Sequence, residues 1–309
     1  MNETPFVVET SGLTKRFGDR EVVKDVELHV PRGSAFGYLG PNGAGKTTLI
    51  RMLLGLTPAT SGSMRLLGLP VPARRGEALR RVGAIVEEPM FHGHLTGREN
   101  LHIVAAAREP EAHTRIPAAL EKVGLTARAD DPVKTYSMGM RQRLGVARVL
   151  LADPELLILD EPANGLDPAG ILEFRGLIRR LVDEGRTVML SSHLLDEVEK
   201  TCDAVAIVDR GQVVMQGTIA ELRDSGGTQV VIEADPIDRA RILLASSRTV
   251  SAVSDDGSSL RARLTDPDAV ADLNRRLVEA GIAVSRLEPV QASLEQRFLE
   301  ITTRFEEAA

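Results

Sequence analysis

The chain has 309 residues, of which 43% are hydrophobic and 27% are charged. This length corresponds to two domains of about 150 residues, and the composition excludes an intrinsically disordered chain, a collagen-like repeat and a disulfide-stapled scaffold. The formal net charge is -6, aromatic residues make up only 3%, and there is no tryptophan. We therefore expect no nucleic-acid partner, because such a partner calls for a basic surface or a base-stacking platform.

Neither a membrane span nor an export signal is evident in the sequence. The longest apolar runs, such as 103–107 and 204–208, are far shorter than the roughly 18 residues that a spanning helix needs. The first residues, 1–5, contain neither a basic nor an apolar stretch. The single cysteine, Cys202, has no internal disulfide partner, which fits a reducing compartment. We expect a cytoplasmic protein with no direct membrane insertion.

The first 225 residues alternate short β-branched runs with amphipathic helical stretches, which predicts an α/β domain around a largely parallel sheet. Residues 96–151 have a helical pattern, broken at Pro110, Gly124 and Pro132. We expect this segment to form a helical subdomain inserted into the sheet domain. The predicted strands of the sheet domain are 7–9, 22–30, 35–39, 81–86, 156–159, 187–191, 204–209 and 212–216.

A turn-rich stretch at 224–228 predicts a boundary between a domain at 1–225 and a second domain at 226–309. The second domain follows the order strand, helix, strand, strand, helix, strand, which is typical of a small α+β domain of the ferredoxin-like type. A last helix is expected at 293–305.

Residues 40–47 match the pattern G-x-x-x-x-G-K-[ST] between a predicted strand and a predicted helix. In such a turn the glycines let backbone N–H groups point at phosphates, the lysine (Lys46) reaches the β- and γ-phosphates, and the hydroxyl of Thr47 binds Mg²⁺. A glycine-rich turn without a ligand is the weaker alternative. The segment predicts binding of ATP or GTP through Gly40, Pro41, Asn42, Gly43, Ala44, Gly45, Lys46, Thr47 and Thr48.

Two acidic residues follow the continuous apolar run 156–159. A buried parallel strand delivers such residues to its carboxyl end, where ligands of α/β proteins bind. Many strands end in an aspartate for structural reasons, but two adjacent acids after four aliphatic residues favour a functional interpretation. Asp160 fits the role of a carboxylate that supports Mg²⁺. Glu161 fits the role of a group that polarises the water that attacks the bound nucleotide.

Together these elements resemble the nucleotide-binding subunit of ATP-binding-cassette (ABC) transporters over about residues 5–225. The resemblance implies a P-loop NTPase cassette with an inserted helical subdomain. Residues 136–143 resemble the family's signature segment, in which Ser137 and Gly139 would contact the γ-phosphate held by the opposite subunit. Met138 and Met140 depart from the usual glycine and glutamine, and Ser137 read alone is equally a helix cap.

Three further positions match the family's pattern, and each has a structural alternative. Asp167, at the end of 164–167, lies in the segment that crosses the dimer interface in the family, or it simply caps the next helix. His193 resembles the histidine that senses the γ-phosphate, although a lone histidine is usually structural. Phe17 matches the aromatic residue that stacks on adenine, or it belongs to a hairpin core.

Glu87 aligns with a glutamine that reaches Mg²⁺ and the attacking water in the family. A carboxylate at this position adds negative charge near the metal, so either Mg²⁺ is bound differently or Glu87 points away in the resting state. His92 and His94 lie just beyond, and without a third ligand at a recognisable spacing a solvated loop is expected rather than a metal site.

The resemblance implies ATP and Mg²⁺ as cofactors and ATP hydrolysis as the activity. One phosphate-binding turn and one signature segment per chain imply a head-to-tail homodimer. The partner is then a separate transmembrane permease, docked between residues 87–95 and the helical subdomain, with the chain peripheral on the inner face of the membrane.

Within the family, the signature, Glu87, residues 160–168 and a tail at 294–300 are similar to bacterial exporters of the daunorubicin and bacitracin type. This similarity implies export of drugs or antibiotics. One alternative is a soluble cassette ATPase that acts on ribosomes or DNA, and another is a protein that sequesters a drug through its C-terminal domain.

Overall fold

The computed structural model describes residues 5–224, 228–257, 259–266 and 269–291. Contacts between residues divide the chain into two units, Met1–Gly217 and Thr218–Ala309. The division lies before helix α9 (Ile219–Asp224), whereas the sequence placed the boundary after it. Thr218 and Glu221 form a reciprocal cap, in which each backbone N–H donates to the other's side chain, so the helix starts directly after the preceding strand.

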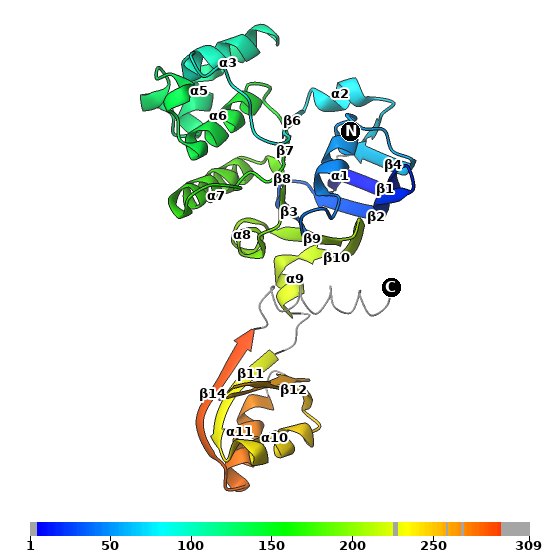
Figure 1. Ribbon diagram of the computed structural model, residues 1–309, viewed down its shortest axis with the longest axis vertical. Helices are drawn as coiled ribbons and strands as arrows, with labels where there is room; N and C mark the ends of the chain where they lie inside the picture. Colours follow the sequence, from blue (N-terminus) through cyan, green and yellow to red (C-terminus); the bar gives the residue numbers. More distant parts are fainter. Residues whose placement is uncertain (1–4, 225–227, 258, 267–268, 292–309) are drawn as a thin grey trace. The chain divides into compact units, whose positions relative to one another are not determined.

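Two sheets form the first unit (Figure 1). The six-stranded sheet has the order β10-β9-β3-β8-β7-β6, and β9, β3, β8, β7 and β6 run parallel. The four-stranded sheet has the order β2-β1-β4-β5 and is antiparallel. The strands are β1 (Phe6–Phe17), β2 (Arg20–Pro31), β3 (Ala35–Leu39), β4 (Ser61–Leu66), β5 (Leu69–Val71), β6 (Val82–Ile85), β7 (Leu156–Leu159), β8 (Thr187–Ser192), β9 (Ala204–Asp209) and β10 (Gln212–Thr218).

The sequence did not predict β4 and β5, and therefore missed that a separate antiparallel sheet exists. Residues 61–63 of β4 are Ser-Gly-Ser and exposed, so this strand lacks the apolar alternation that identifies strands. Gly62 is required there, because a Cβ would lie 2.2 Å from the Gly12 carbonyl oxygen. The close approach of two backbones, rather than side-chain burial, holds this part of the sheet.

Helix α1 (Lys46–Leu53) is packed between the two sheets. Its apolar side chains, including Leu49, Ile50 and Leu53, join one core with residues of both sheets such as Leu28 and Phe36. Burial of such side chains stabilises the fold by about 1.5–3 kcal/mol each relative to exposure. The start of α1 is thereby fixed relative to the ends of the parallel strands.

Helices fill the chain between β6 and β7, as the sequence predicted. These are α3 (Gly97–Ala106), α4 (Glu111–Thr114), α5 (Ile116–Lys122) and α6 (Met138–Leu150), with two short 3₁₀ turns. Thr96 and Glu99 form a capping box that starts α3. The remaining helices of the unit are α2 (Arg75–Leu79), α7 (Pro168–Asp183) and α8 (Leu195–Thr201).

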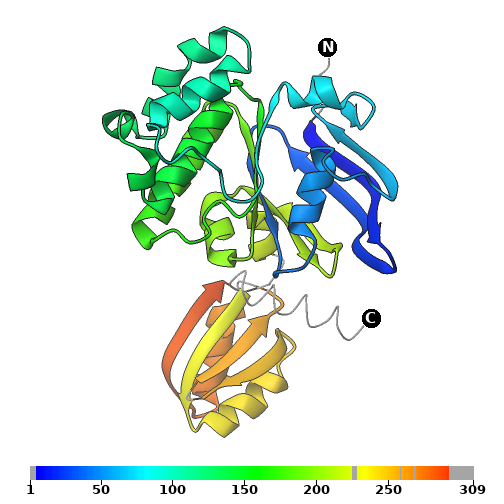
Figure 2. The ribbon, with the colours of Figure 1, turned by 45° about the horizontal axis from the view of Figure 1, so that its top comes forward.

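The second unit has the predicted ferredoxin-like order (Figure 2). Its sheet has the strand order β12-β13-β11-β14 with antiparallel neighbours, and two helices cover one face. The elements are β11 (Thr228–Asp235), α10 (Ile237–Ala245), β12 (Val250–Asp256), β13 (Ser259–Leu264), α11 (Val270–Glu279) and β14 (Ala283–Gln291). The helix expected at 293–305 and the tail at 294–300 lie outside the described residues.

No helix in the described ranges combines the length and the hydropathy needed to cross a membrane.

We predict that Leu244→Ala destabilises the second unit by about 2–5 kcal/mol, because Leu244 is fully buried in its core. Ile242→Ala on the same helix is the control, since Ile242 is 70% exposed and its truncation changes stability by about 0.5 kcal/mol or less. Hydrogen exchange of β11 and β13 amides in urea measures the difference. Equal loss of protection in both variants would contradict this assignment of the core.

Candidate functional site

The turn after β3 needs glycine at two positions and leads into an uncapped helix start. Gly43 and Gly45 have φ values of 83° and 96°, a region that only glycine occupies readily. A Cβ at Gly45 would lie 2.5 Å from the Val22 carbonyl oxygen. No side chain caps the start of α1, so its first N–H groups remain available for an anion.

Lys46 folds back over this turn. Its ammonium donates hydrogen bonds to the carbonyl oxygens of Gly40, at 2.7 Å, and Pro41, at 3.1 Å, and the side chain is only 6% exposed. The Glu161 carboxylate lies 3.1 Å from the same nitrogen. A positive charge is therefore held at the centre of the turn, next to one of the two predicted acids.

Asp160 joins α1 to two neighbouring strands. Its Oδ2 accepts a hydrogen bond from Thr47 Oγ1 at 2.8 Å, and its Oδ1 accepts one from Ser191 Oγ at 2.6 Å. A hydroxyl and a carboxylate together are the kind of oxygen ligands that Mg²⁺ takes alongside water and substrate phosphate. No group of three or more His, Cys, Asp or Glu in the described residues could hold a metal ion.

Glu161 lies between two partners. One carboxylate oxygen is near Lys46, and the other lies 2.8 Å from Nδ1 of His193. The backbone N–H of Glu161 donates to Ser191 Oγ at 2.9 Å. Residues that the sequence placed in separate motifs are thus in direct contact, because β7 and β8 are paired in parallel with Leu159 opposite Leu190.

Ser191 was missed as a site residue in the sequence. It is fully buried, and its single hydroxyl contacts the side chain of Asp160 and the backbone of Glu161. The available signal was a pair of serines directly after the apolar run 188–190, since buried polar side chains need hydrogen-bond partners.

Glu197 on α8 was also missed. Burial raises the pKa of its carboxyl group, the nearby Glu161 raises it further, and His193 lowers it. Its Oε1 is buried with no hydrogen-bond partner in the described structure. Glu197 is therefore a buried carboxyl group next to the Glu161–His193 contact.

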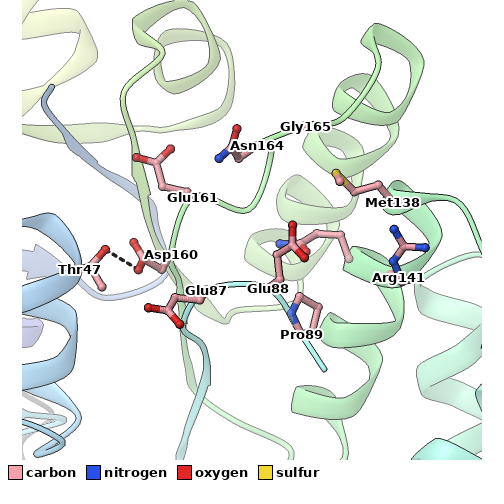
Figure 3. Close-up of a pocket in the computed structure, with 11 residues that line it drawn as sticks. Thr47, Glu87, Glu88, Pro89, Met138, Arg141, Asp160, Glu161, Asn164 and Gly165 are labelled. Carbon is pink, nitrogen blue, oxygen red and sulfur yellow. Dashed lines mark hydrogen bonds between the residues drawn. The ribbon is translucent and has the colours of Figure 1, made fainter. Parts of the chain in front are cut away.

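A cleft of about 490 Å³ opens in front of these residues (Figure 3). Thr47 and the two acids line one side, and residues of α6 and the segment after β7 line the other. The lining residues are Thr47, Glu87, Glu88, Pro89, Met138, Arg141, Gln142, Asp160, Glu161, Asn164 and Gly165.

Glu87 lines this cleft but does not contact Thr47 or Asp160. Its carboxylate forms an ion pair with Arg51 of α1, and its φ of 64° lies in the left-handed region. The structure thus pairs Glu87 with a basic side chain on the α1 side of the cleft, and which of the two arrangements holds when Mg²⁺ is bound stays a prediction.

The predicted signature residues lie at the start of α6. Ser137 caps this helix, because its Oγ accepts a hydrogen bond from the Met140 N–H at 3.2 Å. Ser137 is exposed, and neither it nor Gly139 lines the cleft. The contact that the structure shows for Ser137 is thus the helix cap, and its role toward a nucleotide stays a prediction.

Asp167 caps α7 by accepting a hydrogen bond from the Gly170 N–H at 3.0 Å, which is the structural role the sequence allowed. Phe17 is 51% exposed and the Lys15 ammonium lies 4.8 Å from its ring centroid, so it does not belong to a hairpin core. Residues that follow it in the hairpin line a hollow of about 480 Å³ together with Gly43.

Comparisons with known proteins agree with this geometry. A family model described as "ABC transporter" matches residues 23–164, and one described as "ATP-binding protein DrrA1-3-like, C-terminal domain" matches residues 217–302. An uncharacterised ABC transporter ATP-binding protein, YdbJ of Bacillus subtilis (strain 168), is 41% identical, covering 97% of each chain.

Two further relatives have more informative names. The bacitracin transport ATP-binding protein BcrA of Enterococcus faecalis is 38% identical, covering 96% of each chain. The daunorubicin/doxorubicin resistance ATP-binding protein DrrA of Streptomyces peucetius is 36% identical, covering 98% of this chain and 94% of the relative.

A solved structure titled "Structure of ATP binding subunit of ABC transporter" is 30% identical and superposes with a TM-score of 0.62, covering 71% of this chain and 92% of that one. The chain therefore belongs to the ATP-binding subunits of ABC transporters, ATPases that hydrolyse ATP to power transport, and it carries the C-terminal domain of the DrrA1-3-like members.

Proposed function

We propose that two copies of this chain bind two MgATP between them and that hydrolysis drives a separate permease that exports drugs or antibiotics. The observation that carries the proposal is the direct contact of Lys46, Glu161 and His193 beside the Thr47–Asp160 pair. Phosphoryl transfer depends on positioning of the reacting groups and neutralisation of the phosphate charge rather than on a covalent intermediate with the protein. These side chains supply both.

Each residue has a distinct role in this proposal. Lys46 and the N–H groups of 40–48 bind the phosphates, and Phe17 stacks on the base. Thr47 and Asp160 hold Mg²⁺, which neutralises phosphate charge when bound. Glu161 orients the attacking water and accepts its proton, while His193 holds the Glu161 side chain through the observed contact.

A homodimer is proposed because the signature residues do not line the cleft beside Thr47 and the acids. Ser137 is exposed and lies outside the cleft, so it is available to a nucleotide held by a second copy. Each chain carries one turn and one signature, and a head-to-tail pair therefore completes two identical sites. Asp167 and Gly139 would lie at the same interface.

The names of the relatives support the partner, cargo and location that we propose. BcrA is named for bacitracin transport and DrrA for daunorubicin and doxorubicin resistance, which favours transport over action on ribosomes or DNA. We place the chain on the cytoplasmic face of the membrane, held there by a permease docked against residues 87–95 and the helical subdomain. We propose that an accessory domain follows this ATPase; the sequence places the boundary at 225/226, and the contacts in the structure divide the chain one helix earlier, before α9.

Glu161→Gln is expected to lower kcat for ATP by roughly 10²- to 10⁴-fold, because an amide cannot accept the proton of the attacking water. ATP binding is expected to persist, since Lys46 and the turn remain. Glu88→Gln is the control: this residue lines the same cleft but is not assigned to the reaction. Steady-state hydrolysis of the complex with its permease is the measurement, and unchanged turnover in Glu161→Gln would reject the role.

Ser191→Ala is expected to lower kcat/KM by about 10- to 100-fold, because loss of a buried hydrogen bond to a charged group costs about 1.5–3 kcal/mol. Thr187→Val is the matched control at the other end of β8, where a buried hydroxyl accepts from the Gly33 N–H. Both variants lose one buried hydroxyl, and only Ser191 touches the site. Equal kinetic losses would mean that Ser191 acts through stability alone.

The dimer is tested by crosslinking Asn42→Cys/Ser137→Cys chains with a short bifunctional maleimide. Both positions are exposed, while burial raises the pKa of the Cys202 thiol and keeps it unreactive. MgATP in the Glu161→Gln background is expected to increase the yield of crosslinked dimer several-fold. Each single cysteine variant serves as a control, and a yield independent of nucleotide would speak against the sandwiched arrangement.

A further inference from the structure

The cleft in front of the site is strongly acidic. Four carboxylate residues line it, Glu87, Glu88, Asp160 and Glu161, against a single basic lining residue, Arg141, among those the structure describes. Asp160 and Glu161 have partners that the proposed reaction uses. Glu87 instead pairs with a residue that has no role in the site described so far.

That residue is Arg51, and its position on α1 is informative. Thr47 and Arg51 are four residues apart on the same helix, so their side chains lie on one face, about one turn or 5.4 Å apart. At the first turn Thr47 contacts Asp160, and at the next Arg51 contacts Glu87. Helix α1 therefore contacts both acidic segments, the one after β7 through Thr47 and the one after β6 through Arg51.

The sheet places both carboxylates at the same edge. β6 pairs with β7 with Ile85 opposite Leu159, and the Asp160 N–H donates to the Ile85 carbonyl oxygen at 2.9 Å. Glu87 therefore emerges beside the Asp160–Glu161 pair. In Figure 3 its carboxylate extends toward α1, whereas Glu88 extends in a different direction.

The Arg51–Glu87 ion pair is weak. The two side chains are 43% and 67% exposed, and exposed ion pairs contribute only about 0.2–1 kcal/mol. A contribution of this size favours one position of the Glu87 side chain but still allows others.

We propose that Arg51 is a positioning residue for the nucleotide site: it holds Glu87 on the α1 side and compensates its charge when a polyanionic nucleotide enters. The inference rests on the proposed function. A carboxylate at position 87 repels the phosphates of a nucleotide, whereas a neutral side chain would not. The charge of Arg51 offsets this repulsion and so explains how the chain tolerates Glu87 there. Without Arg51, Glu87 adds an uncompensated negative charge next to the site.

A double-mutant cycle on the full chain tests this, with Mg-AMP-PNP affinity by calorimetry and KM and kcat for MgATP as readouts. Arg51→Met is expected to raise Kd and KM about two- to fivefold with kcat changed by less. In a Glu87→Gln background the same substitution is expected to have no further effect, because no charge remains to compensate. Arg51→Lys keeps the charge and is expected to retain most of the affinity.

Arg74→Met is the matched control. Arg74 forms an ion pair with Glu77 on α2, and the two side chains are 53% and 52% exposed, so the variant loses a similar pair away from the cleft. An equal loss of affinity from Arg51→Met in both backgrounds would overturn the proposal, since Arg51 would then act on nucleotide or fold directly. No loss in either background would overturn it as well. Failure of the unmodified chain to bind Mg-AMP-PNP would instead reject the proposed function and, with it, this inference.

Discussion

The parallel register of β3, β8 and β7 is the constraint on which the site depends. Leu39 of β3 lies opposite Ser192, and Leu190 of β8 lies opposite Leu159, so three strands end at the same edge. The phosphate-binding turn, Ser191 and the acids after β7 all leave the sheet there. A shift of one strand by one residue would move Ser191 to the other face and separate the acids from their shared hydroxyl.

The electrostatics of the edge follow from this register. Lys46 and Asp160 are buried, and a buried charge is tolerated only when paired or hydrogen-bonded. Lys46 has two carbonyl oxygens and Glu161 as partners, and Asp160 has two hydroxyls. A nucleotide phosphate and Mg²⁺ can exchange with these contacts without leaving an unpaired charge.

Local patterns were sufficient to predict much of this site. The spacing of Gly40, Gly45 and Lys46 identified the turn, and four aliphatic residues before Asp160 identified the strand that delivers the acids. Contacts of Ser191 and Arg51 were not predictable in this way, because their partners are about 30 or more residues distant and depend on strand order. Strand β4 escaped prediction because its first half, 61–63, is exposed and held by a backbone approach at Gly62, and its two buried side chains, Met64 and Leu66, are too few to form a recognisable strand pattern.

Met138, at the start of α6, packs against a glycine in the segment after β7. A Cβ added at Gly165, whose φ is 74°, would lie 2.5 Å from Met138 Sδ. The long side chain at 138 is therefore accommodated because residue 165 has none, and a thioether fills such irregular gaps well. Since Leu166 also lies 3.7 Å from the Cβ position of Gly139, the start of α6 and the segment 164–167 pack as one body. This contact connects the segment that follows the acids of β7 to the residues that we propose to face a second copy, so the proposed dimer has a short structural link between its two sites.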